Sequence, residues 1–140
     1  MSIGSILDGR RTVVSVAPEA TVREIVGLLD RHRIGAVLVI DADHIEGIVS
    51  ERDIVGQLHQ LGAAVLDATA RMVMTAPVVT AAPDSSIAAA MATMTNRRIR
   101  HLPVMAGTTL CGLVSIGDLV KRRIEEAEQE ASVLKDYIAS

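Results

Sequence analysis

The stretch GIVSERD at residues 47–53 returns as GLVSIGD at residues 112–118, with the glycine, the serine and the aspartate at the same spacing. The two stretches lie 65 positions apart, and Pro18 and Pro83 are separated by the same distance. When residues 13–55 are laid over residues 78–120 without a gap, twelve of the 43 aligned positions are identical. Chance rarely aligns proline, glycine, serine and aspartate together over 43 positions without a gap. The chain therefore contains two copies of one structural unit, too few for a solenoid.

The first copy predicts a strand, a helix, a hairpin and a second helix, in that order. A short apolar strand at residues 13–16 stops at Pro18, because proline cannot continue the pairing. Thr21, with Glu24 three residues later, predicts a capping box at the start of the helix, and Gly35 predicts its end. An apolar strand at residues 36–40, a tight turn and a strand at 45–50 predict the hairpin, and another helix begins near residue 51.

The second copy repeats this order, with a strand at 78–80, a helix from 86 to about 96, strands at 102–105 and 110–115, and a final helix. The first helix of each copy carries an apolar stripe in steps of three and four: Val22, Ile25, Val26 and Leu29, then Ile87, Ala90, Met91 and Met94. Helices cover one face of such a sheet and leave the other open. We therefore expect an α/β (α+β) fold with two β-α-β-β-α repeats packed sheet to sheet about a pseudo-twofold axis, leaving two related clefts.

The composition excludes several classes of protein. The 140 residues are 49% apolar but only 1% aromatic, without Trp or Phe, and the net charge is −3. Nucleic-acid binding is not expected, because it relies on basic surfaces and stacking aromatic residues. No apolar run is long enough for a membrane span, and residues 1–8 lack the pattern of a secretory signal. A lone cysteine, Cys111, favours a reducing compartment. We expect a cytoplasmic protein.

Catalytic and metal-binding patterns are also missing from the sequence. Cys111 lies between Leu110 and Gly112 in a predicted strand, and the alternation there favours a small buried residue over a nucleophile. The four histidines lack the spacing of metal ligands, and neither the P-loop nor the dinucleotide glycine pattern occurs. We therefore expect no enzymatic activity, no metal and no catalytic cofactor.

Both quoted stretches match the G-h-h-[ST]-x-x-[DN] signature of cystathionine-β-synthase (CBS) domains, and the chain resembles a CBS pair from residue 3 to about residue 124. Residues 68–75 resemble the linking helix before a second repeat, and residues 98–104 resemble the segment entering its second strand. The resemblance divides the chain into a first repeat with its lead-in (1–65), a second repeat with its linking helix (66–124) and a helical extension (125–140). It is nearest to small bacterial proteins made of little besides one CBS pair.

The resemblance implies a disc-like module that binds AMP, ADP, ATP, NAD(H) or S-adenosylmethionine in its clefts. Asp53 and Asp118 would then accept the ribose hydroxyls. Ser50 and Ser115 stand where free N–H groups and the helix dipole favour a phosphate. The alternative is that each serine is only an N-cap and each aspartate only a first-turn acid. Recurrence of the pair at one spacing in both copies favours ligand binding.

A basic cluster suggests that the two clefts differ. The resemblance assigns Arg100 and His101 to phosphate contacts, whereas their counterparts Gly35 and Ala36 carry no charge. The resemblance also implies that the strand end around Thr80 and Ala82 contacts the edge of the adenine. Pro103 would then pack beside the base. The complete candidate set is Ser15, Ala17, Ala36, Ser50, Arg52, Asp53, Thr80, Ala82, Arg100, His101, Pro103, Ser115 and Asp118.

The end of the chain predicts one more interaction. After three basic residues, an apolar stripe runs through a charged background: Ile124, Ala127, Ala131, Leu134 and Ile138. Such a stripe favours a partner surface, and we expect a homodimer; the alternative is a tail that packs on its own repeat. Together these features predict a regulatory or sensor module that binds an adenine nucleotide. A ligand-free dimerisation module and an S-adenosylmethionine-binding pair remain alternatives.

Overall fold

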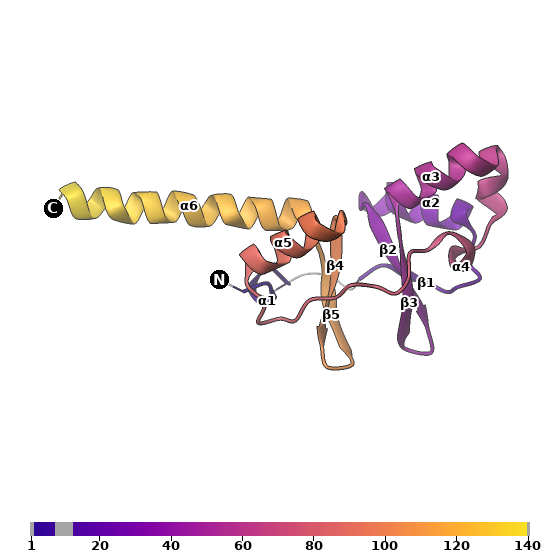
Figure 1. Cartoon of the computed structure of the whole chain (residues 1–140), viewed down its shortest axis with the longest axis horizontal. Helices are drawn as coiled ribbons and strands as arrows, with labels where there is room; N and C mark the ends of the chain where they lie inside the picture. The colour runs from indigo at the N-terminus through magenta and orange to yellow at the C-terminus, as the bar shows by residue number, and fades with distance from the viewer. Residues whose placement is uncertain (1, 8–12, 140) are drawn as a thin grey trace. The chain divides into compact units, whose positions relative to one another are not determined.

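The computed structural model describes residues 2–7 and 13–139 (Figure 1). Its elements in chain order are α1 (Gly4–Leu7), β1 (Ser15–Val16), α2 (Val22–His32), β2 (Ala36–Asp41), β3 (His44–Ser50), α3 (Glu51–Leu61), a 3₁₀ helix (Gly62–Asp67), α4 (Ala70–Val73), α5 (Ile87–Arg97), β4 (His101–Ala106), β5 (Thr109–Ser115) and α6 (Ile116–Ala139). They form two compact units, one of residues 13–78 and one that combines residues 2–7 with residues 79–139.

The first unit is a three-stranded sheet covered by helices. Strand β1 runs parallel to β2, and β2 pairs with β3 in an antiparallel hairpin. The core lies between α2 and the sheet and includes Val22, Ile25 and Leu29 from the helix and Val37, Val39 and Val49 from the strands. Val26 is 40% exposed. It therefore lies outside the core, which includes the other three residues of the stripe.

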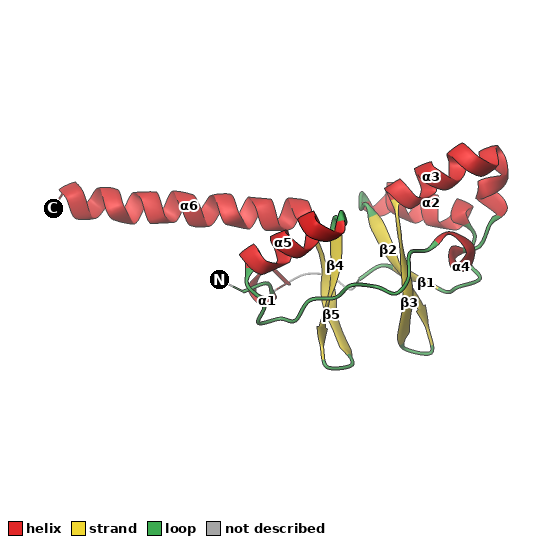
Figure 2. Ribbon diagram, in the orientation of Figure 1, coloured by secondary structure: helices red, strands yellow, loops and turns green. Residues whose placement is uncertain are grey.

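The second unit is built on the hairpin of β4 and β5, with α1, α5 and the start of α6 packed against it (Figure 2). Its core includes Ile3 and Ile6 from α1, Ile87, Ala90 and Met94 from α5, Leu102, Val104 and Val114 from the strands, and Leu119 from α6. The predicted first-helix stripe of this copy is confirmed, with Met91 packed at its edge.

The two hairpins have one register, which confirms the repeat. Ala36 pairs with Ser50 and His101 pairs with Ser115, each pair shifted by 65 residues. Even the irregularity recurs, after Val39 in one hairpin and after Val104 in the other. The same sequence pattern therefore produces the same backbone twice, down to a local bulge.

The predicted strand at residues 78–80 does not form, and proline explains the difference. In the first unit, the N–H of Leu38 donates to the carbonyl oxygen of Val14 at 3.3 Å. Pro103 occupies the position of Leu38 and has no N–H to donate. What remains is a single parallel bridge between Ala81 and Val104.

Both first helices end on an arginine, and α2 does not reach the predicted Gly35. Arg33 (φ 52°) caps α2 and Arg98 (φ 55°) caps α5, each in the left-handed conformation. Their N–H groups donate to carbonyls of the last helical turn. Gly35 therefore lies after the helix end. At the other end of α2, the N–H of Glu24 donates to the Thr21 hydroxyl at 3.2 Å, which confirms that N-cap.

A lead-in segment precedes each copy, residues 2–7 before the first and residues 68–74 before the second. Each segment packs on the copy that does not follow it in sequence. The N–H of Ile3 donates to the carbonyl of Ser85 at 2.9 Å, and that of Ala70 donates to Ala20 at 2.7 Å. Gly47 and Gly112 make this docking possible, because a Cβ on Gly112 would lie 2.7 Å from Leu7 Cδ2. The packing units thus differ from the division at residues 65 and 66, since residues 2–7 join the second copy and residues 68–74 join the first.

The prediction that Cys111 is buried is wrong, because the residue is exposed. The buried positions of β5 are Gly112 and Val114, and side chains alternate along a strand. Cys111 therefore falls on the opposite face from this buried pair.

Candidate functional site

The junction between β5 and α6 is held by Ser115 and Asp118. The N–H of Ser115 donates to Asp118 Oδ2 at 2.8 Å, and the N–H of Asp118 donates to Ser115 Oγ at 3.2 Å. Ser50 and Asp53 make the same reciprocal bonds at the start of α3, at 2.9 and 3.2 Å. The capping role is therefore confirmed in both copies, and it explains the serine-to-aspartate spacing locally. A ligand role for these residues stays a prediction.

Asp53 has further partners within its own unit. Its Oδ2 also accepts a hydrogen bond from the Ser50 hydroxyl at 3.0 Å, and its Oδ1 accepts one from the Thr75 hydroxyl at 3.0 Å. Thr75 is 22 residues away, and no local pattern in the sequence pointed to this contact. Asp53 already accepts three hydrogen bonds within its own unit, so a pair of ribose hydroxyls would compete with these partners.

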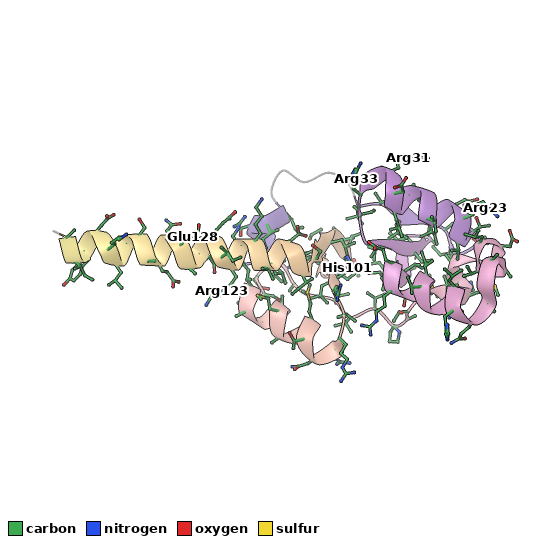
Figure 3. All side chains as sticks on the ribbon, turned by 90° about the horizontal axis from the view of Figure 1, so that it is seen from above. Arg23, Arg31, Arg33, His101, Arg123 and Glu128 are labelled. Atoms are coloured by element: carbon green, nitrogen blue, oxygen red, sulfur yellow. The ribbon has the colours of Figure 1, made fainter. Side chains whose placement is uncertain are left out.

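Arg100 and His101 lie beside the start of α6. His101 pairs with Ser115 across the hairpin, and the N–H of Ile116 donates to the Arg100 carbonyl at 2.8 Å. Arg100 is exposed and His101, labelled in Figure 3, is half-buried. Arg100 and His101 therefore lie next to Ser115 and the N-terminus of α6, where a cationic side chain would favour an anion. The N–H groups of Ile116 and Asp118 in the first turn are already bonded within the unit.

The equivalent place in the first unit has the same backbone but lacks the charge. Ala36 pairs with Ser50, and the N–H of Glu51 donates to the Gly35 carbonyl at 2.9 Å. The two junctions therefore differ in their side chains, as the sequence predicted. Arg52, on the first turn of α3, is exposed and is the basic residue of the predicted set in this unit.

The remaining candidates lie farther along the strands. Thr80 and Ala82 flank the Ala81–Val104 bridge, three residues along β4 from His101. The N–H of Ala82 donates to Ser85 Oγ at 3.2 Å, so this backbone donor already has a partner. Ser15, Ala17 and Thr80 are exposed, whereas Ala36 and Pro103 are buried. The two buried residues offer little surface for a ligand.

A pocket of about 540 Å³ in the first unit was not foreseen from the sequence. It opens between the end of α2 and the first turns of α3, and it is lined by Val26, Leu29, Asp30, Arg33, Ile34, Gly35, Glu51, Ile54 and Val55. The sequence contained one signal for it: the apolar stripe on α2 has four residues, one more than the core of this unit includes. Val26 lines the pocket instead of the core.

The described part of the chain contains no cluster of three or more His, Cys, Asp or Glu side chains that could hold a metal ion. None of its helices has both the length and the apolar content needed to cross a membrane.

Comparison with known proteins gives one consistent family. The family model for the CBS domain matches residues 3–60 and residues 70–125. The CBS domain-containing protein CBSX3, mitochondrial, of Arabidopsis thaliana is 32% identical over 123 residues, which cover 84% of this chain and 60% of that protein. The chain spans about a third to two thirds of the length of the first curated relatives it matches.

Solved structures agree with the family match. The CBS-domain containing protein ATU1752 of Agrobacterium tumefaciens is 41% identical, with a TM-score of 0.84 over 88% of this chain and 99% of the other. The CBS domain protein PAE2072 of Pyrobaculum aerophilum, solved in complex with AMP, is 28% identical, with a TM-score of 0.75 over 84% of this chain and 89% of the other.

Proposed function

This chain belongs to the CBS domain family as a pair of repeats, and we propose that it regulates by binding an adenine nucleotide at the β5–α6 junction. The observation that carries the proposal is the meeting of Arg100, His101, Ser115 and Asp118 at that junction. The AMP complex of the relative from Pyrobaculum aerophilum supports the choice of ligand class.

Each group has a proposed role. Arg100 and His101 bind the phosphate beside the N-terminus of α6, and Asp118 accepts hydrogen bonds from the ribose hydroxyls. The backbone at Thr80 holds the adenine edge, because the N–H of Ala82 already donates to Ser85 Oγ. AMP, ADP, ATP and NAD all present these three parts, and binding needs no catalysis. We place the protein in the cytoplasm, because an exposed free thiol such as Cys111 stays reduced there.

The proposed inequality of the two junctions gives the first test. We expect calorimetric titration with AMP to show one dominant site that weakens as salt rises, because Arg100 and His101 have no charged counterparts in the first copy. Arg100→Ala should weaken AMP binding by about 1.5–3 kcal/mol, roughly 10–150-fold, and should leave adenosine binding unchanged.

Arg97→Ala is the matched control, because it removes another exposed arginine at the end of α5. It should leave AMP affinity nearly unchanged. Two indistinguishable sites, or equal affinities for adenosine and AMP, would contradict the proposed phosphate site.

Two alternatives differ from this proposal in what they bind. A ligand-free dimerisation module is favoured by the capping bonds, which already explain Ser115 and Asp118 without a ligand. It predicts no heat of binding with any adenine compound. S-adenosylmethionine carries a cationic sulfonium and no phosphate. Its binding would therefore persist in Arg100→Ala.

We also propose that the protein is a homodimer and that α6 contributes to the contact. Ile124, Leu134 and Ile138 are 53%, 59% and 74% exposed, and burying each such side chain contributes about 1.5–3 kcal/mol. Sedimentation at micromolar concentration should give the mass of two chains. A chain truncated after Arg123 should dissociate at a concentration where the full chain stays paired. Equal dimerisation of both would exclude α6 from the contact.

A further inference from the structure

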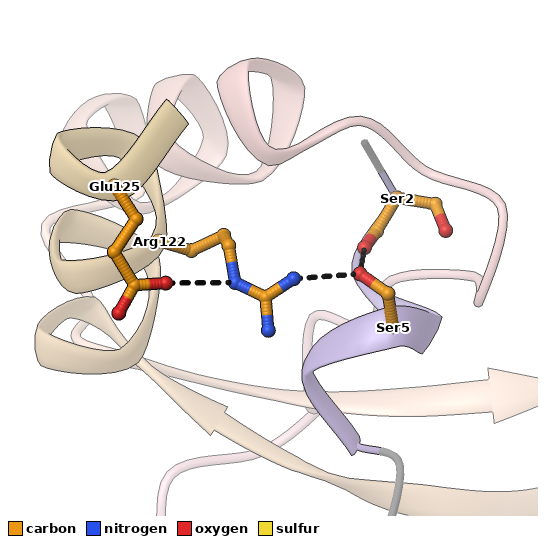
Figure 4. A network of polar contacts seen from close by, with 4 residues as sticks. All are labelled: Ser2, Ser5, Arg122 and Glu125. Carbon is orange, nitrogen blue, oxygen red and sulfur yellow. Dashed lines mark hydrogen bonds and ion pairs between the residues drawn. The ribbon is translucent and has the colours of Figure 1, made fainter. Parts of the chain in front are cut away.

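One face of α6 already packs on its own unit. Leu119 is buried there, and Arg122 Nη1 donates to the Ser5 hydroxyl at 3.2 Å (Figure 4). The same arginine is paired through its Nε with Glu125 at 3.5 Å. Four residues beyond Arg122, Glu126 is still half-buried. We call this side of α6 the inner face.

A second face of α6 carries regularly spaced apolar residues. The steps between them alternate between four and three, as at the a and d positions of a heptad. This outer stripe consists of Val120, Ile124, Ala127, Ala131, Leu134 and Ile138. At 3.6 residues per turn it lies roughly a third of a turn from the inner face. Its residues are all exposed, so the contacts of α6 with its own unit leave the outer stripe uncovered.

The charges that flank the outer stripe are ordered. Arg123 and Glu130 lie along one edge, at g positions, and Glu128 and Lys135 lie along the other, at e positions. Figure 3 shows the side chains of Arg123 and Glu128 on α6. In a parallel pair of such helices, each g residue faces the e residue five positions later on the other helix. Arg123 then faces Glu128 of a second copy, and Glu130 faces Lys135.

The same charges oppose the reverse orientation. In an antiparallel pair with the same overlap, Glu130 would face Glu130 and Glu128 would face Glu128, which repel. Arg123 bonds Glu126 of its own helix at 3.3 Å, but its side chain is 54% exposed. A guanidinium has five N–H donors and can keep this bond while binding a second carboxylate.

We propose that α6 pairs with α6 of a second copy as a parallel, in-register coiled coil over residues 120–138. The inference rests on the proposed homodimer and specifies its contact. Ile124, Leu134 and Ile138 form the large layers, and the small side chains of Ala127 and Ala131 let the helices approach closely between them. Parallel pairing also brings the two β5–α6 junctions to the same end of the coil.

Cysteine cross-linking tests the pairing directly. In a Cys111→Ser background, Leu134→Cys places a thiol on the outer stripe, and Val133→Cys places one beside it on another face. The two native side chains are almost equally exposed, at 59% and 62%, so exposure alone would predict equal reactivity. Under mild oxidation of the full chain, we expect Leu134→Cys to give mostly covalent dimer and Val133→Cys to stay single.

The outcomes separate the coiled coil from the dimer. If the chain sediments as a dimer but both variants cross-link equally, or neither does, the parallel coil is wrong and the dimer stands. If the chain is monomeric, both proposals fail.

Charge exchange at the coil edges adds an independent measure. Glu130→Lys and Lys135→Glu should each raise the dimer dissociation constant roughly threefold or more, and the double variant should restore it. If the double variant dimerises as weakly as the two single effects added together would predict, the proposed pairing of Glu130 with Lys135 is wrong.

Discussion

Replacing Leu119 with alanine is expected to lower the free energy of unfolding by about 2–5 kcal/mol, the usual cost of truncating a buried leucine. Leu119 has no exposed surface, and within the described part of α6 it is the one buried residue. It joins α6 to a core that includes Leu102, Val104 and Val114. The cavity would loosen the helix next to Asp118, so AMP affinity should fall as well. Urea unfolding measures the first effect and calorimetry the second.

The repeat supplies a graded control for this change. Ile54 is the counterpart of Leu119 in the first copy but is only half-buried, so Ile54→Ala should cost clearly less. Val133→Ala, on the exposed part of α6, should stay within about 0.5 kcal/mol of the original chain. If Leu119→Ala costs no more than Val133→Ala, the account of how α6 is anchored is wrong.

Asp118→Ala is expected to weaken AMP binding by about 1.5–3 kcal/mol, or roughly 10–150-fold, because the ribose loses a charged acceptor. The same change removes the capping bond from the Ser115 N–H, so it should also lower stability by about 0.5–2 kcal/mol. Titration and urea unfolding of one variant measure the two effects separately.

Two further variants separate ligand binding from capping. Asp118→Asn keeps an oxygen acceptor for the cap, so its stability should recover while part of the AMP affinity stays lost. Asp53→Ala removes the equivalent cap and the bond from Thr75, yet it should leave the dominant site almost unchanged. The ribose role of Asp118 is ruled out if affinity is unaffected both in Asp118→Ala and in the Asp53→Ala/Asp118→Ala double variant.

The sequence by itself determined the repeat, both hairpins, most helix limits and the inequality of the two junctions. These features depend on residues that are close together in the chain. Alternating apolar residues set the strands, and a serine with an aspartate three residues later sets a helix start through bonds that span a single turn. Because the constant shift of 65 aligns Arg100 and His101 with Gly35 and Ala36, the charge difference was also visible without coordinates.

Other features were decided only by the tertiary structure, because each depends on a partner that is distant in sequence. The strand at residues 78–80 fails because its would-be neighbour on β4 is Pro103. The second oxygen of Asp53 is occupied by Thr75, and the lead-ins dock against Gly47 and Gly112 of the opposite copies. Cys111 and Val26 have apolar patterns typical of a core, yet both are exposed, because periodicity does not say which face of an element is covered. That choice belongs to the packing of residues far apart in the chain.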